Sequence, residues 1–496
     1  ENRYELLMRT KRDVAVPLQD ELKAHVGARM AALVQKSATA LKAGAEAAAA
    51  KPAAPVAKKV DVNKRVASQV RGAAERVKDF AEVDQGYTME EAMSESTRCL
   101  NCKKPRCKDA CPVHIRIPEM IQAIKAGKFE EAFNIVMELN PLVAVCGRVC
   151  PHPCEAKCIR GVKGEPLNIM LLKRAASDFC SRPVPAVAKD LGKKVAIIGS
   201  GPAGLAAAYH LRLAGAAVTI FEQKSIAGGM MSLCIPSYRL PRDMLKADID
   251  RILAMGVELK LNTTFGKDVT LEQLQKEYDA VVLAIGSMKP KKLKIPGEDA
   301  QGVEHVIHFL ESINVENRKE IGKKVVVVGA GFSALDAVRA SRRLGSEATI
   351  VYRRDRAQMP ATKEEVAEAE QEGVKLELLA NPVEVIVKDG KVAGLKCIRM
   401  KLGAADKSGR PAPEPIPGSE FVIECDQVIQ AISQESELTG VDAKTSDWNS
   451  IETDANGRTS LPHVWAAGDA VTGPKTIVES VAAATVAAKD ILASFN

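Results

Sequence analysis

The chain has 496 residues, of which 46% are hydrophobic and 4% aromatic, and carries a formal net charge of +7 at pH 7. This length exceeds what one hydrophobic core holds, so we expect about three domains. No run of about eighteen apolar residues occurs, which excludes a membrane-spanning helix, and the modest charge does not indicate nucleic-acid binding. The start of the sequence shows no secretory signal, which predicts a cytoplasmic protein with reduced cysteines.

The region before the first cysteine is predicted to be mostly helical. Residues 1–40 carry leucines at helical spacing, and residues 43–59 are rich in alanine, lysine and proline, as is typical of a linker. We interpret residues 1–60 as a helical arm and linker that either docks a partner or is a dispensable extension. Residues 60–96 then resume an amphipathic helical pattern.

Eight of the 12 cysteines lie in two runs of four. The first run is Cys99, Cys102, Cys107 and Cys111, and the second is Cys146, Cys150, Cys154 and Cys158. Two sets of four thiolates are what two 4Fe-4S clusters require, and Pro112 after the first run is typical of cluster-binding sequences. Structural zinc remains the alternative, although zinc ribbons usually pair two Cys-x2-Cys knuckles and only one such spacing occurs here.

The interval between the two runs has a clear periodicity. Residues 117–140 carry apolar side chains at helical spacing in two stretches separated by Gly127, which predicts a helical hairpin. A hairpin returns the second run to the first, so each cluster could take cysteines from both. Pro151 and Pro153 exclude a regular helix through the second run, which we interpret as a ligand-bearing loop. We assign residues 61–190 to an α-helical iron-sulfur domain.

A dinucleotide-binding motif begins after residue 193. A buried strand runs into Gly199, Gly201 and Gly204 at the G-x-G-x-x-G spacing, and a helix follows. These glycines permit a tight turn, the approach of a pyrophosphate and close helix packing, and the helix N-terminus favours the anion. Glu222 ends the next strand, at the place where a carboxylate binds a ribose hydroxyl.

A second copy of the motif begins near residue 324. Its turn and helix start contain Gly329, Gly331, Ser333 and Ala334. Counted from the first glycine of each copy, Tyr352 stands where the first copy has Glu222. This second site lacks the ribose carboxylate and offers Arg353 and Arg354, which can bind a 2′-phosphate. A solvated strand end is the alternative role of these arginines, and NADPH and NADH both remain possible.

The C-terminal region completes the first of these folds. Gly468 and Asp469 follow a strand, and an aspartate there can accept a hydrogen bond from the ribityl chain of a flavin. Two dinucleotide folds in one chain are explained if one holds FAD and the other holds the nicotinamide nucleotide that reduces it. We therefore predict an α/β fold with two Rossmann-like domains. The FAD domain takes residues 191–315 and 450–496 and is split by a NAD(P)H domain at residues 316–449.

Several motifs together resemble one known family. They include RCLNC, GRVCPHPCEAKC, VAIIGSGPAGL, VVVVGAGFSALDAVR and WAAGDAVTGP, in order and at suitable spacing over about four-fifths of the chain. The sequence resembles the glutamate synthase small (beta) subunit family of FAD, NAD(P)H and iron-sulfur oxidoreductases. It is also similar to the N-terminal flavin half of dihydropyrimidine dehydrogenase and to the large subunit of NADH-dependent ferredoxin:NADP oxidoreductase.

The resemblance implies how the cysteines are shared between the clusters. It assigns one cluster to Cys99, Cys102, Cys107 and Cys158, and the second to Cys111, Cys150 and Cys154. The fourth ligand of the second cluster is often a Gln or Glu in relatives, where this chain has Lys173. A lysine ammonium cannot bind iron, so we expect Cys146 to complete this cluster, with Glu165 as the alternative.

The resemblance also adds contacts around the flavin. It implies FAD contacts from Ala203, Gly229 and Arg239. The chain departs from the family pattern at Cys234, Ser433 and Ala484, where glycine is common in relatives.

These assignments predict an electron-transferring oxidoreductase subunit. It would move electrons between NAD(P)H and a catalytic partner subunit or a ferredoxin-like carrier, through FAD and two 4Fe-4S clusters, within a hetero-oligomer. Hydride transfer takes place at the flavin, so no catalytic side chain is assigned. The alternatives are an assembly subunit with structural metal sites and a stand-alone flavin reductase with a small acceptor.

Overall fold

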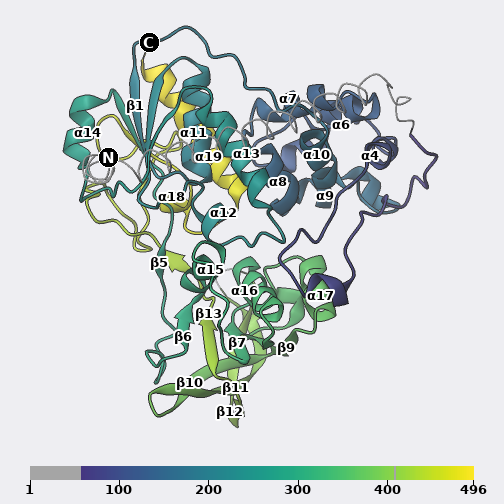
Figure 1. Ribbon diagram of the computed structural model, residues 1–496, viewed down its shortest axis with the longest axis vertical. Coiled ribbons are helices and arrows are strands. Elements are labelled where there is room, and N and C mark those ends of the chain that lie inside the picture. The colour runs from purple at the N-terminus through teal and green to yellow at the C-terminus, as the bar shows by residue number, and fades with distance from the viewer. Residues whose placement is uncertain (1–56, 407–408, 496) are drawn as a thin grey trace, which may run out of the picture. The chain divides into compact units, whose positions relative to one another are not determined.

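The computed structural model describes residues 57–406 and 409–495. The arm and linker predicted for residues 1–60 therefore lie almost entirely outside the described residues. From Ala57 onward the chain forms one unit, in which a helical region precedes two α/β regions (Figure 1). Within the described ranges, no helix is long and apolar enough to cross a membrane.

The helical region carries all eight clustered cysteines. Its helices are α3 (Ala73–Arg76), α4 (Met89–Ser96), α5 (Arg106–Ala110), α6 (Ile117–Lys125), α7 (Phe129–Met137), α8 (Val143–Val149), α9 (Pro153–Ala156) and α10 (Ile169–Asp178), with the 3-10 turn η1 (Ile159–Val162). The predicted hairpin is α6 and α7, joined at Gly127, whose φ of +73° suits glycine. The hairpin prediction is confirmed.

Two local predictions for this region were wrong. Residues 60–96 hold only α3 and α4, because most of this stretch runs irregularly across other elements, as in the isolated bridge between Val70 and Asp84. The second cysteine run is not a loop throughout. It passes through α8 and α9, which are separated at Cys150 by extended backbone and at His152 by left-handed backbone.

The first α/β region contains a five-stranded parallel sheet in the order β15-β4-β1-β2-β3. The strands are β1 (Lys194–Ile198), β2 (Ala217–Phe221), β3 (Glu258–Lys260), β4 (Ala280–Leu283) and β15 (Val464–Ala466). Its helices are α11 (Pro202–Leu213), α12 (Met230–Leu233), α13 (Arg242–Leu253), α14 (Leu271–Glu277), α18 (Asp469–Thr472) and α19 (Ile477–Ser494). Strand β1 is buried after its first residue, as expected for a parallel sheet covered on both faces.

The second α/β region repeats this plan. Its parallel sheet has the order β6-β13-β7-β8-β9, so the strand before the glycine turn is central in both sheets. The strands are β6 (Val303–His305), β7 (Lys324–Val328), β8 (Glu347–Tyr352), β9 (Lys375–Leu378) and β13 (Gln427–Gln430), and the helices are α15 (Val306–Asn314), α16 (Phe332–Arg343) and α17 (Lys363–Gln371), with the 3-10 turn η2 (Arg356–Gln358).

The sheet topology moves the domain boundaries that we expected. Strand β6 and helix α15 belong to the second sheet and its core rather than to the FAD region. The chain crosses between the regions at β5 (Lys289–Pro290) and β14 (Gln434–Glu435), which pair antiparallel. The second region therefore begins near residue 291 and ends near residue 433, where we had expected residues 316 and 449.

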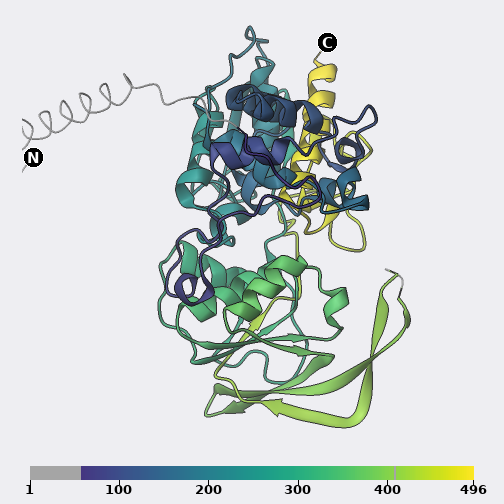
Figure 2. The same cartoon turned by 90° about the vertical axis from the view of Figure 1, so that its right-hand side faces the viewer.

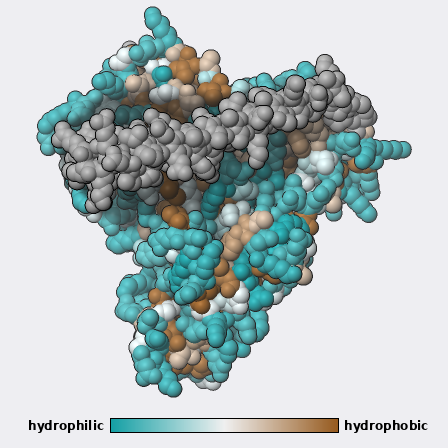
Figure 3. Space-filling model, in the orientation of Figure 1, coloured by the Kyte–Doolittle hydropathy of each residue, from teal (hydrophilic) through white to brown (hydrophobic). Residues whose placement is uncertain are grey.

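An antiparallel sheet extends the second region. Its strands are β10 (Ala380–Lys388), β11 (Lys391–Ala405) and β12 (Pro411–Ile423). Figure 2 shows β11 and β12 as a long curved hairpin that reaches away from the parallel sheet. Over the described residues, the face in Figure 3 is mostly hydrophilic, with small separate hydrophobic areas.

One hydrophobic core joins the cysteine-bearing helices to the FAD-type sheet. It runs from Phe133 in α7 and Leu172 in α10 to Ile197 in β1 and Val481 in α19. The second parallel sheet divides its buried side chains between two separate cores. The iron-sulfur and FAD regions are therefore packed as a single body, to which the nucleotide region is added.

Candidate functional site

The first glycine turn leaves space where a pyrophosphate would lie. Gly199 has a φ of +100°, and a Cβ there would meet Ala284 O at 2.4 Å, while a Cβ on Gly204 would meet Gly199 O at 1.9 Å. A Cβ on Gly201, in contrast, meets no atom within 4 Å. Helix α11 begins at this turn without a side-chain cap, so its first N–H groups are available to an anion.

A carboxylate at the end of β2 lies directly against this turn. Glu222 is buried, and its Oε2 accepts hydrogen bonds from the Ser200 N–H at 2.9 Å and the Ser200 hydroxyl at 2.6 Å. Gly229 has a φ of +53°, and a Cβ there would lie 2.9 Å from Gly201 Cα. The predicted dinucleotide residues are thus gathered around one open turn, which fits the pyrophosphate and ribose of FAD.

Asp469 begins α18, directly after Gly468. Gly468 has a φ of +75°, and a Cβ there would meet Ala203 Cβ at 2.9 Å, so the C-terminal motif lies against the start of α11. Asp469 Oδ1 accepts a hydrogen bond from the Lys475 N–H at 3.1 Å. Burial raises the pKa of Asp469 to about 6. The Ser480 hydroxyl lies 3.5 Å from the same Oδ1, and among the described residues no hydrogen bond reaches Oδ2, which fits the predicted ribityl contact.

The second glycine turn repeats the geometry of the first. Gly329 has a φ of +135°, and a Cβ there would meet Ala431 O at 2.3 Å, whereas a Cβ on Gly331 meets nothing within 4 Å. Ser333 is exposed at the start of α16, and Ala334 is buried. Helix α16 also begins without a side-chain cap. The turn therefore offers a second anion site on the nucleotide region.

The two arginines after β8 differ in their surroundings. Arg354 is buried, pairs with Asp406 at 2.6 Å and donates to Pro411 O. Arg353 is exposed, and within residues 57–406 and 409–495 its side chain makes no hydrogen bond or ion pair. Tyr352 donates its hydroxyl to Gln358 O at 2.7 Å. Of the two predicted phosphate contacts, Arg353 is the available one.

Seven of the eight cysteines of the two runs line two neighbouring pockets, and Cys146 lines neither. Cys99, Cys102, Cys107 and Cys158 line the first, which we call the outer cysteine pocket. All of these cysteines are partly exposed. Burial raises the pKa of Cys107 to about 11, and the nearby Cys158 adds to the rise.

The inner cysteine pocket is lined by Cys111, Cys150, Cys154 and Lys173. Ile169 lines both pockets, and Val478 of α19 completes the inner one, so the inner pocket lies between the outer pocket and the FAD-type domain. The grouping of the cysteines in the two pockets is the one that the resemblance implied. Ligation itself stays a prediction.

Lys173 is a buried cation that faces thiols. Its exposed fraction is 7%, and within the described ranges its side chain has no ion pair or hydrogen bond. Burial acts to lower the pKa of Lys173, but the charges of Cys150, Cys146, Cys154 and Cys111 outweigh it and raise this pKa. A buried ammonium without a carboxylate fits a site that holds an anionic group such as a four-thiolate cluster.

Cys146 lies at the same site. Burial raises the pKa of the Cys146 thiol to about 12, and the charges of Lys173 and Cys150 act on it. Asn140 accepts from the Leu142 N–H through Oδ1, and its buried Nδ2 finds no acceptor among the described residues. Because this amide can donate to the Cys146 sulfur, the orphaned donor fits a thiolate ligand there.

Glu165, the alternative fourth ligand, lies elsewhere. It is exposed, it accepts a hydrogen bond from the Arg65 N–H at 2.7 Å, and it does not line either cysteine pocket. Cys146 does not line a pocket either, but its thiol is buried and feels the charges of Lys173 and Cys150, which makes it the better candidate.

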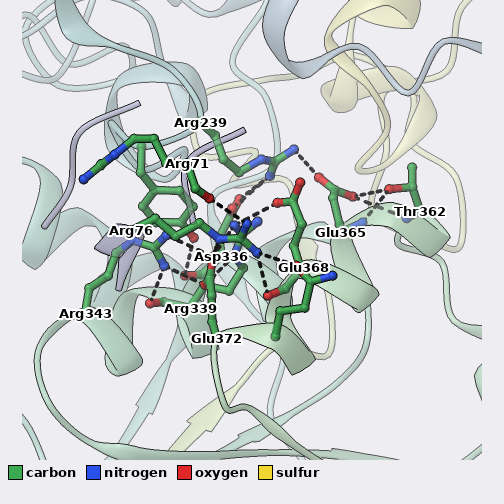
Figure 4. Close-up of polar contacts among 12 residues, drawn as sticks. Arg71, Arg76, Arg239, Asp336, Arg339, Arg343, Thr362, Glu365, Glu368 and Glu372 are labelled. Atoms are coloured by element: carbon green, nitrogen blue, oxygen red, sulfur yellow. Dashed lines mark hydrogen bonds and ion pairs between the residues drawn. The ribbon is translucent and has the colours of Figure 1, made fainter. Parts of the chain in front are cut away.

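Arg239, which the resemblance assigned to FAD, is held by two carboxylates. Its guanidinium donates to both oxygens of Asp336 in α16 at 2.8 and 2.9 Å and pairs with Glu365 in α17 at 2.6 Å (Figure 4). Its position bridges the FAD region and the start of the nucleotide region. A flavin contact from Arg239 stays a prediction.

Sequence reasoning missed a second set of buried ions in the same place. Glu372 accepts from Arg76 at 2.7 Å, from Arg339 at 2.6 Å and from Arg343 at 2.8 Å, as Figure 4 shows. The ring of Tyr238 lies under Arg343, whose guanidinium carbon is 3.8 Å from the ring centroid. Glu372 thereby ties helix α3 of the iron-sulfur region to α16 of the nucleotide region.

A polar cavity of about 300 Å³ lies beside this ion cluster. Phe332 and Arg339 of α16 line one side, and Cys150 and Arg174 of the iron-sulfur region line the other. This volume is at the lower end of ligand pockets. The second glycine turn therefore opens next to a space that reaches the cysteine-bearing region.

The three departures from the family pattern are accommodated by local structure. Ser433 adopts a φ of +94°, which is a glycine-like conformation, and its carbonyl accepts from His305 Nε2 at 3.2 Å. Cys234 is buried, and burial raises the pKa of its thiol. Ala484 is fully buried in the core beside α11.

Comparison with known proteins yields a family match for the two α/β regions and another for the cysteine-bearing helical region. The family model for pyridine nucleotide-disulphide oxidoreductases matches residues 193–486, more than half of the chain. The chain belongs to this family. A second family model, that of dihydropyrimidine dehydrogenase domain II with a 4Fe-4S cluster, matches residues 76–183. A pyridine nucleotide-disulphide oxidoreductase domain is therefore preceded by a 4Fe-4S domain.

Two relatives extend this result. NADPH-Fe(3+) oxidoreductase subunit beta of Geobacter sulfurreducens is 44% identical over 423 residues, which are 78% of this chain and 63% of that protein. Glutamate synthase [NADPH] small chain of Escherichia coli is 34% identical over 452 residues, which are 84% of this chain and 93% of that protein. The resemblance to the glutamate synthase small subunit family is confirmed. The chain spans less than two thirds of the Geobacter relative.

A solved structure supports the fold. FprA of Mycobacterium tuberculosis, in complex with NADPH, matches with a TM-score of 0.54 and 21% identity, covering 61% of this chain and 84% of that chain. At this identity the likeness shows the fold alone. The predicted fold class, with two Rossmann-like domains after a 4Fe-4S domain, is confirmed.

Proposed function

We propose that this pyridine nucleotide-disulphide oxidoreductase is an electron-input subunit that moves electrons between NADPH and a partner protein through FAD and two 4Fe-4S clusters. The observation that carries the proposal is the core shared by the cysteine-bearing helices and the FAD-type sheet, because it fixes the two thiol pockets against the domain that carries the first glycine turn. Both relatives are named as NADPH-linked subunits, which supports the same role.

The residues of the chain have separate tasks in this function. The first glycine turn would hold FAD, which supplies hydride acceptance and one-electron donation, and the two cysteine pockets would hold the clusters. The N–H groups at the start of α11 would bind the pyrophosphate, and Glu222 would orient the ribose. The inner cysteine pocket lies nearest the FAD domain, because Val478 of α19 lines it, and the outer pocket holds the partly exposed cysteines, so the two would lead from the flavin toward the surface.

The alternatives fit the arrangement less well. An assembly subunit has no need of two open glycine turns with uncapped helices. A stand-alone flavin reductase has no need of two cysteine pockets that lead from the FAD domain to the surface. A reducing compartment such as the cytoplasm suits thiolate ligands and remains part of the proposal.

Cofactor content tests the proposal. Protein purified without oxygen should contain one FAD, with iron and acid-labile sulfide at eight each per chain, and little zinc. A colourless protein that contains zinc would support the structural-metal alternative instead.

Replacing Cys146 by serine should remove one cluster. Because Lys173 cannot bind iron, loss of this thiolate leaves the inner pocket with only Cys111, Cys150 and Cys154. Iron should fall from about eight to about four per chain, with flavin retained. The matched control is Cys180→Ser, since the charges that act on the partly buried Cys180 thiol are those of Arg182, Arg251 and Glu130 rather than those of Lys173 and Cys150. Unchanged iron in Cys146→Ser would show that another group is the ligand.

Replacing Arg353 by alanine should remove a preference for NADPH over NADH. A charge-assisted contact with the 2′-phosphate contributes about 1.5–3 kcal/mol, or roughly tenfold to a hundredfold in affinity. The measurement is the rate of flavin reduction at low concentrations of each nucleotide. Arg354→Ala is the control, because Arg354 is already held by Asp406. Equal rates with both nucleotides in the wild type would exclude this role.

A further inference from the structure

A set of six cations lies on the two chain segments, residues 99–111 and 153–165, that supply the cysteines of the outer pocket. We call this set the basic face, and it consists of Lys103, Lys104, Arg106, Lys108, Lys157 and Lys163. All are exposed except Lys108, which is partly buried. Arg106 and Lys157 line the pocket itself, and helices α5 and α9 pack together beneath them, so both segments meet at its mouth.

These cations are not neutralised within the protein. Among residues 57–406 and 409–495, none of the six side chains makes a hydrogen bond or ion pair. Exposed lysines elsewhere commonly do, as Lys276 with Glu272 at 2.7 Å and Lys324 with Glu424 at 2.8 Å. Within residues 99–111 and 153–165 the acidic residues are Asp109, Glu155 and Glu165, and Glu155 is buried and paired with Arg65. The basic face is therefore a local excess of positive charge.

The basic face lies where electrons can leave the protein. The cysteines of the outer pocket are partly exposed, whereas Cys111, Cys146, Cys150 and Cys154 are buried. Leu100 also lines the outer pocket and is 50% exposed, which places an apolar side chain inside the charged rim. An apolar centre with a charged rim is the usual anatomy of a protein interface.

We propose that the basic face docks an acidic one-electron carrier protein, which exchanges electrons with the cluster of the outer cysteine pocket. This inference rests on the proposed function. The balance is NADPH plus two oxidised carriers giving NADP⁺, one proton and two reduced carriers, or the reverse. Each encounter moves one electron between the outer pocket and the carrier. Positive charge around the exit speeds the approach of an acidic partner and excludes a basic one.

The test uses an acidic ferredoxin as the probe and the double variant Lys103→Glu, Lys104→Glu in the full chain. Binding of the ferredoxin should weaken at least tenfold, and its dependence on salt should flatten. The double variant Lys103→Gln, Lys104→Gln should bind the ferredoxin with an affinity between those of the glutamate variant and the wild type. Lys388→Glu, Lys391→Glu is the matched control, because these exposed lysines lie at the β10–β11 turn. It should bind like the wild type.

The readouts separate this inference from the proposed function. NADPH should reduce the flavin and the clusters equally well in all three double variants, and failure in the wild type would overturn the proposed function itself. If the cofactors are reduced but wild type does not bind ferredoxin, or binds it no better than the glutamate variant, the docking inference is wrong. Tighter binding of wild type to anionic vesicles or DNA than to ferredoxin, lost in the glutamate variant, would overturn it as well.

Discussion

Replacement of Gly201 by valine is expected to give a folded protein with a full set of iron but little FAD. A Cβ at this position meets no protein atom within 4 Å, so the fold accommodates the side chain. The same open space is where the backbone would approach the pyrophosphate. Loss of even one hydrogen bond to a charged phosphate costs about 1.5–3 kcal/mol, so FAD affinity should fall at least about tenfold.

The matched control for this variant is Gly331→Val. Gly331 occupies the same place in the second glycine turn, and a Cβ there also meets nothing within 4 Å. This variant should keep FAD but lose its reduction by NADPH. Flavin and iron content, measured after gel filtration, distinguish the two. Normal flavin in Gly201→Val would mean that FAD does not use the first turn.

Replacement of Glu372 by glutamine is expected to destabilise the protein strongly. Glu372 is fully buried and accepts from Arg76, Arg339 and Arg343, so its neutralisation leaves buried cations without a counter-charge. Removing one partner of a buried ion pair typically costs about 3–5 kcal/mol. Chemical denaturation should show this loss. The effect should include looser attachment of the nucleotide region, detected as faster hydrogen exchange in α3 and α16.

Because Glu372 is ionised in the folded protein, we expect the stability of the protein to depend on pH. Despite burial, hydrogen bonds and charges from Arg339 and Arg343 lower the pKa of Glu372 from 4.5 to about 2. Its contribution, about 3 kcal/mol, is therefore present above pH 4.5 and is lost as the pH falls toward 2. Glu368→Gln is the control, because Glu368 is partly exposed and pairs only at the edge of the cluster. A Glu372→Gln variant as stable as this control would contradict the role of the cluster.

Much of the fold could be read from local sequence patterns. The strand, glycine turn and helix at Gly199 and at Gly329 are short-range features, because each depends on residues that are adjacent in the chain. The helical hairpin of α6 and α7 likewise follows from apolar spacing around Gly127. The grouping of the cysteines came from the family resemblance, and the two pockets have the same grouping.

The features that sequence reasoning missed depend on contacts between distant residues. Arg76 and Glu372 are separated by 296 positions, and nothing in the sequence near either one signals the other. The domain boundary was misplaced because β6 and α15 join the second sheet only through pairing with β13. Residues 60–96 were predicted as helix from periodicity, although tertiary contacts of an irregular segment decide their structure.

The central claim is that NADPH electrons reach the clusters through FAD within this chain. The most direct measurement is the visible spectrum during anaerobic addition of NADPH to the purified protein, with Gly201→Val beside it. The account predicts that the flavin band bleaches first and that the broad iron-sulfur absorbance then falls, while the clusters of Gly201→Val stay oxidised. Clusters that remain oxidised in the wild type after its flavin is fully reduced by excess NADPH would contradict the account.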